Sequence, residues 1–476
     1  MTNTTEYLIL GAGPTGIGAA LRAEDKGLDW YLAEKEDGYG GLASSFVDPQ
    51  GFTWDLGGHV QFSHYKTFDK YMDEALGVDG WIEHQRESWI WIHNRFIPYP
   101  LQNNLHRFDP PHRWECVKGL IEVNEQILRG DITTPSNFDE WMRGSLGEGL
   151  AEIFMSPYNF KVWAHPLTQL DYSWIGERVS VPDLARVIRS ICLNQDDVSW
   201  GPNAVFRFPK KGGTGAIWDS LGNSLPQNKV GLGKTVVAVE PKERKVRFSD
   251  GSVIQYRYLI STLPLNQLLQ MTDKSEWSSQ ASKLKYSSTN IVGIGLQGLV
   301  PEHLESKCWM YFPEQTSPYY RVTVFSNYSP HNVPNPSEQW SLMAEVSESA
   351  HKPVDQETLI QTCIDALTND GLIPDTSTVV SKVMRRLPQG YPTPFLGRDA
   401  VVDPILRNLE KDDIFSRGRF GAWKYEHSNQ DHSFAQGYQC IDRLSSNGDQ
   451  ECEKTLYLGK WGDVECELEA EEAEKA

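Results

Sequence analysis

The sequence predicts an α/β protein in which a nucleotide-binding sheet is interrupted by a helical insertion and by an antiparallel-sheet insertion. Three observations predict this fold class: a strand, glycine turn, helix and strand at the start of the chain, a β-meander in its middle, and helical and alternating segments between and after them. With 476 residues, the chain is long enough for two or three domains.

The first element is the unit at the start of the chain. An apolar strand, Tyr7–Leu10, runs into the sequence GAGPTG at residues 11–16. An amphipathic helical pattern then continues to about Lys26, and a second strand follows at Trp30–Ala33. A glycine turn between a strand and a helix in such a unit is typical of a Rossmann-like nucleotide-binding domain.

Each glycine of this turn has a distinct expected role. Gly11 permits the tight turn, Gly13 lets the backbone approach a pyrophosphate, and Gly16 lets helix and strand pack closely. The helix N-terminus supplies amide groups and a positive dipole to the phosphates. Glu34 follows the second strand, where a carboxylate accepts the adenosine ribose hydroxyls. We therefore expect a dinucleotide site, the alternative being a plain glycine turn.

A second glycine pair favours FAD over NAD. Residues 37–45 read DGYGGLASS, and such a pair soon after the acidic residue recurs in FAD proteins of the amine-oxidase type, so Gly41, Leu42 and Ala43 are expected at the cofactor. The meander predicted from residues 236–239, 245–248 and 258–262 also resembles this class. The alternative for the meander is an unrelated antiparallel insertion.

The rest of the chain alternates between helical and extended patterns. Helices are predicted at Tyr65–Leu76, Pro111–Arg129 and Ser136–Leu146, the last with a capping box formed by Ser136 and Asp139. Strands are predicted at Thr289–Leu296, Tyr320–Asn327 and Trp340–Glu345.

These patterns divide the chain into a Rossmann-like FAD-binding domain with two insertions and a tail. The expected ranges are 1–75, 200–265 and 395–445 for the discontinuous FAD domain, 76–199 for a largely helical substrate domain with mobile loops, 266–394 for an antiparallel-sheet domain, and 446–476 for an acidic tail. The substrate is expected in the crevice between the domains.

Composition excludes several functional classes. The formal charge is −19, from 45 basic and 64 acidic residues, which disfavours nucleic acid and anionic membranes as partners. The seven cysteines form no C-x-x-C motif, and the chain has neither a membrane-length apolar run nor a signal-like start. A cytoplasmic enzyme is expected, and any anionic ligand must be held by local arginines.

Several distinctive strings carry a family resemblance. They are WDLGGH at 54–59, PYPLQNN at 98–104, PYNFKVW at 157–163, WGPN at 200–203, YFPE at 311–314, GYPTP at 390–394 and NQDHS at 429–433. In this order they closely resemble the eukaryotic-type UDP-galactopyranose mutases of fungi, trypanosomatids and nematodes, from the first strand to about residue 443.

The resemblance assigns expected roles to residues. It places Gly58, His59, Arg419, Asn429 and Gln430 at the flavin, and gives the substrate diphosphate to Arg178 and Arg321, whose guanidinium groups match phosphate oxygens. His59, Arg178 and Arg321 are the predicted catalytic residues, His59 by holding the loop on the flavin side and not as a general base. Further substrate contacts are predicted at Tyr99, Gln102, Phe154 and Asn159 for uridine, and at Trp163, Asn203, Trp309, Tyr311, Tyr391, Tyr425 and Asn429 for the diphosphate and sugar.

The resemblance also implies a mechanism. NAD(P)H, at Arg86 and Ser88, reduces FAD, and N5 of the reduced flavin attacks C1 of the sugar and displaces UDP. The ring then recloses, so that UDP-galactopyranose and UDP-galactofuranose interconvert without net redox change. Three alternatives stay open: a mutase for another UDP-sugar, an FAD oxidoreductase of the amine-oxidase or protoporphyrinogen-oxidase kind, and a binding protein that has lost catalysis. Oligomeric state and the choice between NADH and NADPH are not predicted.

Some positions depart from the family pattern. Leu101 replaces an aromatic residue near uridine, and Gln61 replaces an apolar one after the GGH string. The others are Ser156 for arginine, His165 for valine, and His427-Ser428 for a valine-glycine pair. They leave the chemistry in place but bear on the choice of sugar.

Overall fold

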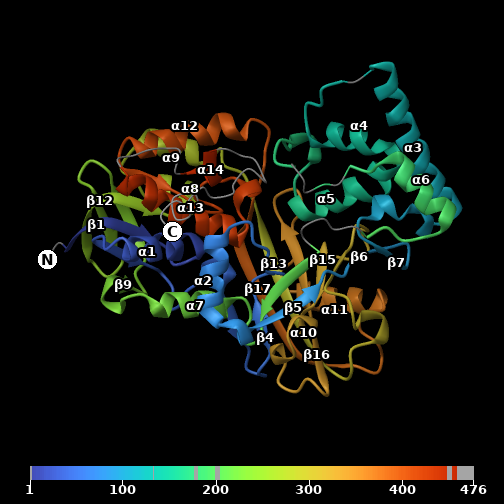
Figure 1. Ribbon diagram of the computed structural model, residues 1–476, viewed down its shortest axis with the longest axis horizontal. Helices are drawn as coiled ribbons and strands as arrows, with labels where there is room; N and C mark the ends of the chain where they lie inside the picture. Colours follow the sequence, from blue (N-terminus) through green and yellow to red (C-terminus); the bar gives the residue numbers. More distant parts are fainter. Residues whose placement is uncertain are drawn as a thin grey trace, which may run out of the picture.

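The computed structural model describes residues 3–131, 133–175, 179, 181–198, 204–446 and 453–457. A first sheet with helices on both faces forms one side of the molecule, and a helical region and a second sheet form the other (Figure 1). The α/β fold class predicted from the sequence is confirmed.

The first sheet contains a parallel core and an antiparallel meander. Its strand order is β10-β11-β12-β1-β2-β9, with β18 also paired to β12. The parallel strands are β1 (Asn3–Leu10), β2 (Trp30–Ala33), β9 (Val230–Gly231), β12 (Val253–Ser261) and β18 (Ile414–Ser416). The meander consists of β10 (Val236–Glu240), β11 (Lys245–Phe248) and β12. Both the first strand pair and the meander were predicted correctly.

Helices cover both faces of this sheet. On one face lie α1 (Pro14–Asp25), α2 (Lys66–Leu76), α7 (Gly215–Ser224) and α13 (Gln430–Ser445). On the other lie α8 (Leu265–Gln270), α9 (Ser275–Ala281) and α12 (Arg398–Glu410). Glycines bring α1 and α13 together, since a Cβ at Gly437 would lie 1.9 Å from the Thr15 carbonyl oxygen. The amino end of α1 therefore packs against the middle of α13.

The second sheet is antiparallel except for one pair. Its order is β17-β13-β16-β15-β14-β6-β7, and only β14 and β6 run parallel. The strands are β6 (Ser88–Ile92), β7 (Arg95–Pro98), β13 (Tyr286–Gln297), β14 (Trp309–Tyr311), β15 (Arg321–Val324), β16 (Gln339–Glu348) and β17 (Thr378–Pro392). The predicted strand Tyr320–Asn327 is wrong in its second half, where α10 (Phe325–Tyr328) begins. Helix α11 (Leu359–Asn369) shares a core with this sheet.

Two small sheets lie between the larger units. One pairs β3 (Ser45–Val47) with β4 (Thr53–Asp55), and the other pairs β5 (Trp81–Gln85) with β8 (Val205–Pro209). A third core joins the helical region to β6 and β7 of the second sheet, through Ile90, Ile92 and Ile97.

The helical region comprises α3 (Pro110–Arg129), α4 (Phe138–Leu150), a π-helical turn η5 (Ala151–Met155), α5 (Ser156–Trp163) and α6 (Leu184–Leu193). Backbone of α3 and α4 meets at two glycines, because a Cβ at Gly147 (φ 79°) would lie 2.3 Å from the backbone carbon of Gly119. The expected cap at Ser136 and Asp139 is wrong: the Asn137 side chain accepts the Glu140 amide at 3.0 Å.

The domain ranges stay a prediction, but the sheets show where segments pair. Strands β6 and β7 belong to the second sheet, while α8 and α9 pack in a core of the first. The segment 453–457 contains α14 (Lys454–Tyr457), whose Leu456 is buried. The remainder of the expected tail lies outside the described residues.

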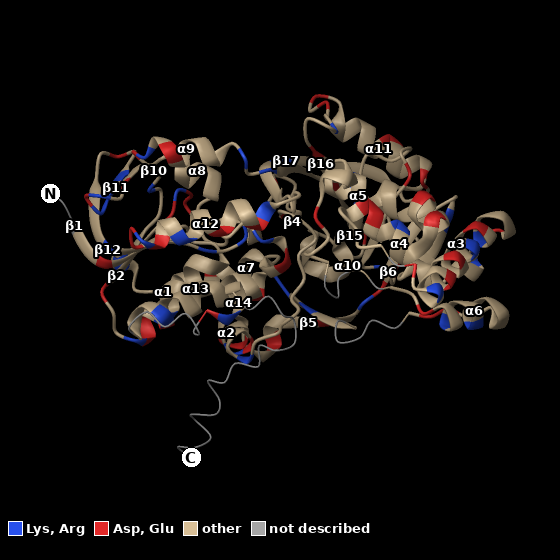
Figure 2. Cartoon of the chain, turned by 90° about the horizontal axis from the view of Figure 1, so that it is seen from above, with Lys and Arg blue, Asp and Glu red and all other residues tan. Residues whose placement is uncertain are grey.

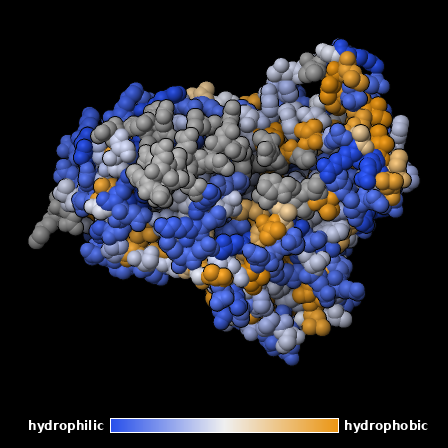
Figure 3. Space-filling view, viewed as in Figure 1, coloured by the Kyte–Doolittle hydropathy of each residue, from blue (hydrophilic) through white to orange (hydrophobic). Residues whose placement is uncertain are grey.

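Surface character is mixed over the described chain. Acidic and basic residues are interspersed along it (Figure 2). Apolar side chains gather over the helical region at the upper right of Figure 3. The exposed apolar side chains of α3 are Trp114, Ile127 and Leu128. No helix among the described residues is both long and apolar enough to cross a membrane. The five described cysteines are free thiols.

Candidate active site

The glycine turn after β1 is shaped by close backbone approaches. Gly11 has φ +100°, and a Cβ there would lie 2.1 Å from Thr262 Oγ1. A Cβ at Gly16 would lie 1.8 Å from the Gly11 carbonyl oxygen, whereas at Gly13 the nearest atom is 3.7 Å away. Helix α1 thus presents its first amides beside a glycine whose Cβ position meets only the Gly40 carbonyl oxygen among the described residues, at van der Waals distance, so the backbone there can approach a pyrophosphate.

Glu34 and the second glycine pair close around this turn. The buried Glu34 carboxylate accepts the Ala12 amide at 2.7 Å and the Glu36 amide at 2.9 Å. The segment Gly41–Ala43 is a short 3-10 helix, and a Cβ at Gly41 would lie 3.5 Å from Gly13 Cα. Contacts around this turn therefore bring together the predicted cofactor residues, which we call the glycine surface: Gly11, Gly13, Gly16, Glu34, Gly41, Leu42 and Ala43.

A buried ion pair joins the second sheet to the GGH loop. Arg321 on β15 donates from Nε and Nη2 to the two oxygens of Glu345 on β16, at 2.6 Å and 2.8 Å. The same carboxylate accepts the Tyr320 hydroxyl at 2.7 Å and the Gly58 amide at 3.1 Å. Glu345 is thus a site residue that the sequence reading missed. The sequence gives only a weak indication of this role: Glu345 ends a predicted strand, Trp340–Glu345, that follows the predicted strand of Arg321.

His59 lies among Arg321, Glu345 and Arg419. Burial lowers the pKa of His59 to about 4; the two arginines act in the same direction and Glu345 opposes them. The imidazole is therefore neutral at pH 7. Its Nδ1 is buried and has no hydrogen-bond partner among the described residues. A buried nitrogen without such a partner, on the loop that Glu345 holds, fits a bound flavin, which offers carbonyl and ring-nitrogen partners.

Arg419 is held between two tyrosines. Its guanidinium donates to the Gly390 carbonyl at 3.1 Å and to Ser428 Oγ at 2.8 Å, and its carbon lies 4.8 Å from the Tyr391 ring centroid and 5.6 Å from that of Tyr425. Ser428, which replaces a glycine of the family pattern, thus helps to hold Arg419, a residue predicted to lie at the flavin.

The other two predicted flavin residues start helix α13. Asn429 is the N-cap of α13, and Gln430 follows it and accepts the Trp218 indole N–H at 2.7 Å. Backbone amides at a helix N-terminus carry partial positive charge, which suits a cofactor that gains electrons.

Aromatic side chains cluster at the edge of the core that joins the helical region to the second sheet. At one end, Trp163 lies 4.8 Å from Tyr425 and 5.8 Å from Tyr391, centroid to centroid. At the other, Tyr311 lies 5.7 Å from Tyr99 and accepts the Trp309 indole N–H at 2.6 Å. Strand β15 connects the two ends: Arg321 is the cross-strand neighbour of Tyr311, and the hydroxyl of the adjacent Tyr320 lies 3.5 Å from that of Tyr391.

Tyr158 is a second residue that the sequence reading missed. Its ring lies 5.4 Å from Tyr311 and stacks on Phe154 at 5.6 Å. The neighbouring Asn159 was predicted instead, but its amide donates to the Met155 carbonyl at 2.8 Å inside the helical core. Gln102 is also buried, in the 3-10 turn Leu101–Asn103.

The remaining predicted positions fall into three groups. Arg86 contacts Ser88 at 3.3 Å, and its guanidinium carbon lies 5.7 Å from the Tyr99 centroid and 5.1 Å from that of Trp309. Arg178 and Asn203 lie outside the described residues. Among the departures, Leu101 is fully buried and His165 contacts the Tyr286 carbonyl at 3.3 Å.

The sheet, the glycine surface and the aromatic cluster define a flavin-dependent enzyme of the amine-oxidoreductase class. The family model for flavin containing amine oxidoreductase matches residues 14–400. A crystal structure of reduced UDP-galactopyranose mutase is 47% identical, with 96% of each chain covered and a TM-score of 0.92. The chain belongs to the UDP-galactopyranose mutase family within that class, and its cofactor is FAD.

Two more distant structures share the fold alone. A protein described as a protoporphyrinogen oxidase from Exiguobacterium sp. 255-15 has a TM-score of 0.71 at 17% identity, with 94% of this chain and 100% of that chain covered. Putrescine oxidase bound to putrescine has a TM-score of 0.63 at 16% identity, over 94% and 100% of the two chains. The far higher identity to the mutase argues against the oxidase alternative.

Proposed function

We propose that this chain interconverts UDP-galactopyranose and UDP-galactofuranose, and that it is a mutase of the eukaryotic type. One observation supports the proposal beyond family membership: Arg321 lies beside Tyr311 on the neighbouring strand and is joined through Glu345 to the flavin-side loop at Gly58. An anion-binding group between aromatic walls suits a nucleoside diphosphate linked to a sugar, whereas a small amine needs no such arginine.

FAD would be held by the glycine surface at its pyrophosphate and by the loop at Gly58 and the start of α13 at its ring. When bound and reduced, it supplies a nucleophile for the sugar C1, a group that no described side chain of the pocket offers. Neutral His59 adds no positive charge at this point, so the field there is set by Arg321, Arg419 and Glu345.

The protein's own groups bind and orient the substrate. Arg321 keeps part of its fork for the diphosphate while Glu345 fixes the other part, so the departing UDP stays near C1. The family resemblance adds Arg178 and Asn203 to this work. Tyr391, Tyr425 and Trp163 exclude water beside the sugar, and Tyr99, Tyr311 and Phe154 wall the uridine end.

Two further parts of the proposal concern reduction and location. NAD(P)H would reduce the flavin from the side of Arg86 and Ser88, where a guanidinium lies over two aromatic rings. The protein would act in the cytoplasm, in keeping with its free thiols.

The test uses the FAD-loaded protein under nitrogen. Dithionite-reduced enzyme should convert UDP-galactofuranose to UDP-galactopyranose, followed by chromatography, and oxidised enzyme should not. The R321A variant should lose most of this activity, and R129A, which changes an exposed arginine of α3, should keep it. UDP binding without conversion would indicate another UDP-sugar, and oxygen-dependent amine turnover without UDP binding would refute the proposal.

A further inference from the structure

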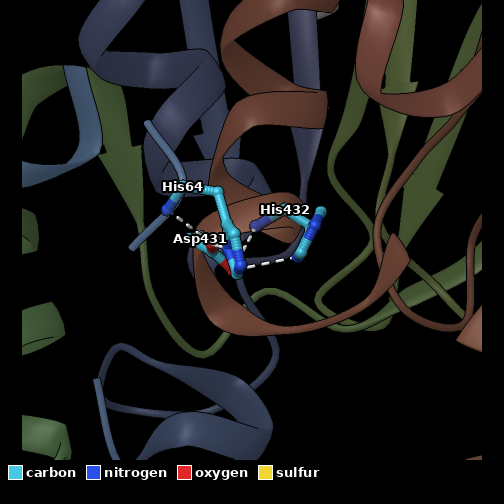
Figure 4. A group of neighbouring side chains, drawn as sticks. All are labelled: His64, Asp431 and His432. Atoms are coloured by element: carbon cyan, nitrogen blue, oxygen red, sulfur yellow. Dashed lines mark hydrogen bonds and ion pairs between the residues drawn. The ribbon is translucent and has the colours of Figure 1, made fainter. Parts of the chain in front are cut away.

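Asp431 lies between two histidines at the amino end of α13 (Figure 4). One carboxylate oxygen contacts His64 Nδ1 at 2.6 Å and the His64 amide at 3.2 Å. The other accepts the His432 amide at 2.8 Å and lies 3.0 Å from His432 Nδ1. A carboxylate only accepts hydrogen bonds, so the His64 imidazole carries a proton on Nδ1. Asp431 is about 1% exposed, so its charge is stabilised by these donors.

The cluster joins two segments that approach the flavin from different parts of the chain. His64 follows the Gly58-His59 loop by a few residues, while Asp431 directly follows Gln430. Burial alone would raise the pKa of Asp431, but the two imidazoles hold it below its usual value, so the carboxylate is ionised at pH 7. The contact is therefore a charge-assisted link across more than 360 residues of sequence.

Neighbouring groups fix the same segment. The Tyr65 ring packs edge-on against His432 at 5.7 Å, and its hydroxyl lies 3.0 Å from Thr455 Oγ1. The side chain of His64 is 27% exposed and lines a surface pocket with Phe68 and Asp69. Asp431 is thus the buried member of the cluster, and His64 closes it toward solvent.

The geometry favours a hydrogen-bonded cluster over a metal site. The donor atoms lie within 4.8 Å of one another, yet each carboxylate oxygen is taken by a different histidine. The His64–Asp431 contact of 2.6 Å is shorter than the spacing of about 3.3 Å between ligands at 2.0–2.1 Å from a tetrahedral zinc ion. These contacts leave no place for an ion between His64 and Asp431.

We propose that Asp431 is a positioning residue for the flavin: it ties the segment Gly58–His64 to the amino end of α13 and so fixes both flavin-facing segments relative to each other. The inference rests on the flavin site described above, but it does not depend on which sugar is used. Loss of the tie should loosen FAD, and loss of a buried negative charge near the flavin should make the midpoint potential more positive, because electrons are then added more easily.

The experiment compares matched variants of the FAD-loaded protein. D431N keeps the size of the side chain but removes the charge and one acceptor; D442N makes the same change near the other end of α13, where Asp442 pairs with Arg22 and Lys26. We expect D431N to release FAD at least tenfold faster, measured by flavin fluorescence, and to shift the potential, while D442N does neither.

A second pair of variants keeps the test decisive if D431N does not fold. Asparagine can donate from a position close to that of histidine Nδ1, whereas leucine cannot. H64N should therefore hold FAD nearly as well as the wild type, and H64L should release it faster. Wild-type FAD release and potential in D431N, or in H64L, would overturn the proposal. So would a stabilisation by one equivalent of Zn²⁺ that D431N abolishes. Mutase activity of the wild type is measured separately, so failure of the proposed mutase function can be distinguished from failure of the positioning role of Asp431.

Discussion

The ion pair between Arg321 and Glu345 predicts an asymmetric loss of stability. Glu345 has a side chain 3% exposed, while that of Arg321 is 22% exposed. In R321M the carboxylate stays buried with only the Tyr320 hydroxyl and the Gly58 amide as donors. Removing one partner of a buried pair costs about 3–5 kcal/mol, and we expect about 3 kcal/mol because Arg321 is partly hydrated.

The reverse change should cost less. In E345Q the guanidinium keeps one acceptor oxygen and can also reach water, so we expect a loss of about 1–2 kcal/mol. The double variant should lose less than the sum of the two single variants, by about 2 kcal/mol, because neither partner is then left alone. Guanidinium chloride unfolding of FAD-saturated protein measures these values as midpoint changes multiplied by a common slope.

The pH dependence supplies an independent check. Burial raises the pKa of Glu345, but Arg321 brings it below its usual value, so the wild-type pair contributes stability at neutral pH that is lost as pH falls through that lowered pKa. In R321M only the effect of burial remains; the pKa rises, and protonation relieves the buried charge. The penalty of R321M should therefore shrink between pH 8 and pH 5. Equal losses for R321M and E345Q, or a penalty independent of pH, would refute this account.

Three further predictions concern single sites. Burial raises the pKa of Asp55 from 3.8 to about 7. The folded state then binds more protons than the unfolded state between these values, and stability should fall by at most about 4 kcal/mol as pH rises through them. D55N should remove this slope in thermal unfolding scans at pH 5 and 8, and a slope left unchanged would contradict the assignment. G16A should abolish FAD binding, measured as flavin retained on purification, because its Cβ would meet a backbone oxygen at 1.8 Å; G38A, with nothing within 4 Å, is the matched control and should bind normally. Y158F should raise KM for the UDP-sugar several-fold with little change in kcat, since it alters a wall of the uridine end; an effect on kcat alone would place Tyr158 elsewhere.

Glycine positions, short apolar runs and alternation predicted the elements whose structure depends on neighbouring residues in the sequence. The turn at residues 11–16 and strand Trp30–Ala33 depend on glycine placement and on a short apolar run, and both were found as expected. The meander followed from alternation and a turn at Asp250-Gly251. Strand Tyr320–Asn327 was overextended, because tertiary packing turns Phe325–Tyr328 into a helix that no alternation signals.

The missed site residues depend on pairings that a single sequence does not contain. Glu345 meets Arg321 only because β15 and β16 pair in one particular register. Tyr158 was not chosen although it is next to Asn159, because the rotation of a helix by about 100° per residue decides which of two neighbouring side chains meets Tyr311. For Asp431, the partner His64 comes from the opposite end of the chain.

The π-helical turn at Ala151–Met155 has a consequence for how this family can vary. It holds one residue more per turn than an α-helix, directly before the helix that carries Tyr158 and Trp163. Deleting one residue there would give a regular helix, but it would swing both rings by about 100° out of the pocket. The number of residues in this segment therefore matters as much as the identity of Tyr158 and Trp163. Insertions and deletions between Ala151 and Met155 should therefore be tolerated less well than conservative substitutions there, apart from Phe154, which stacks on Tyr158.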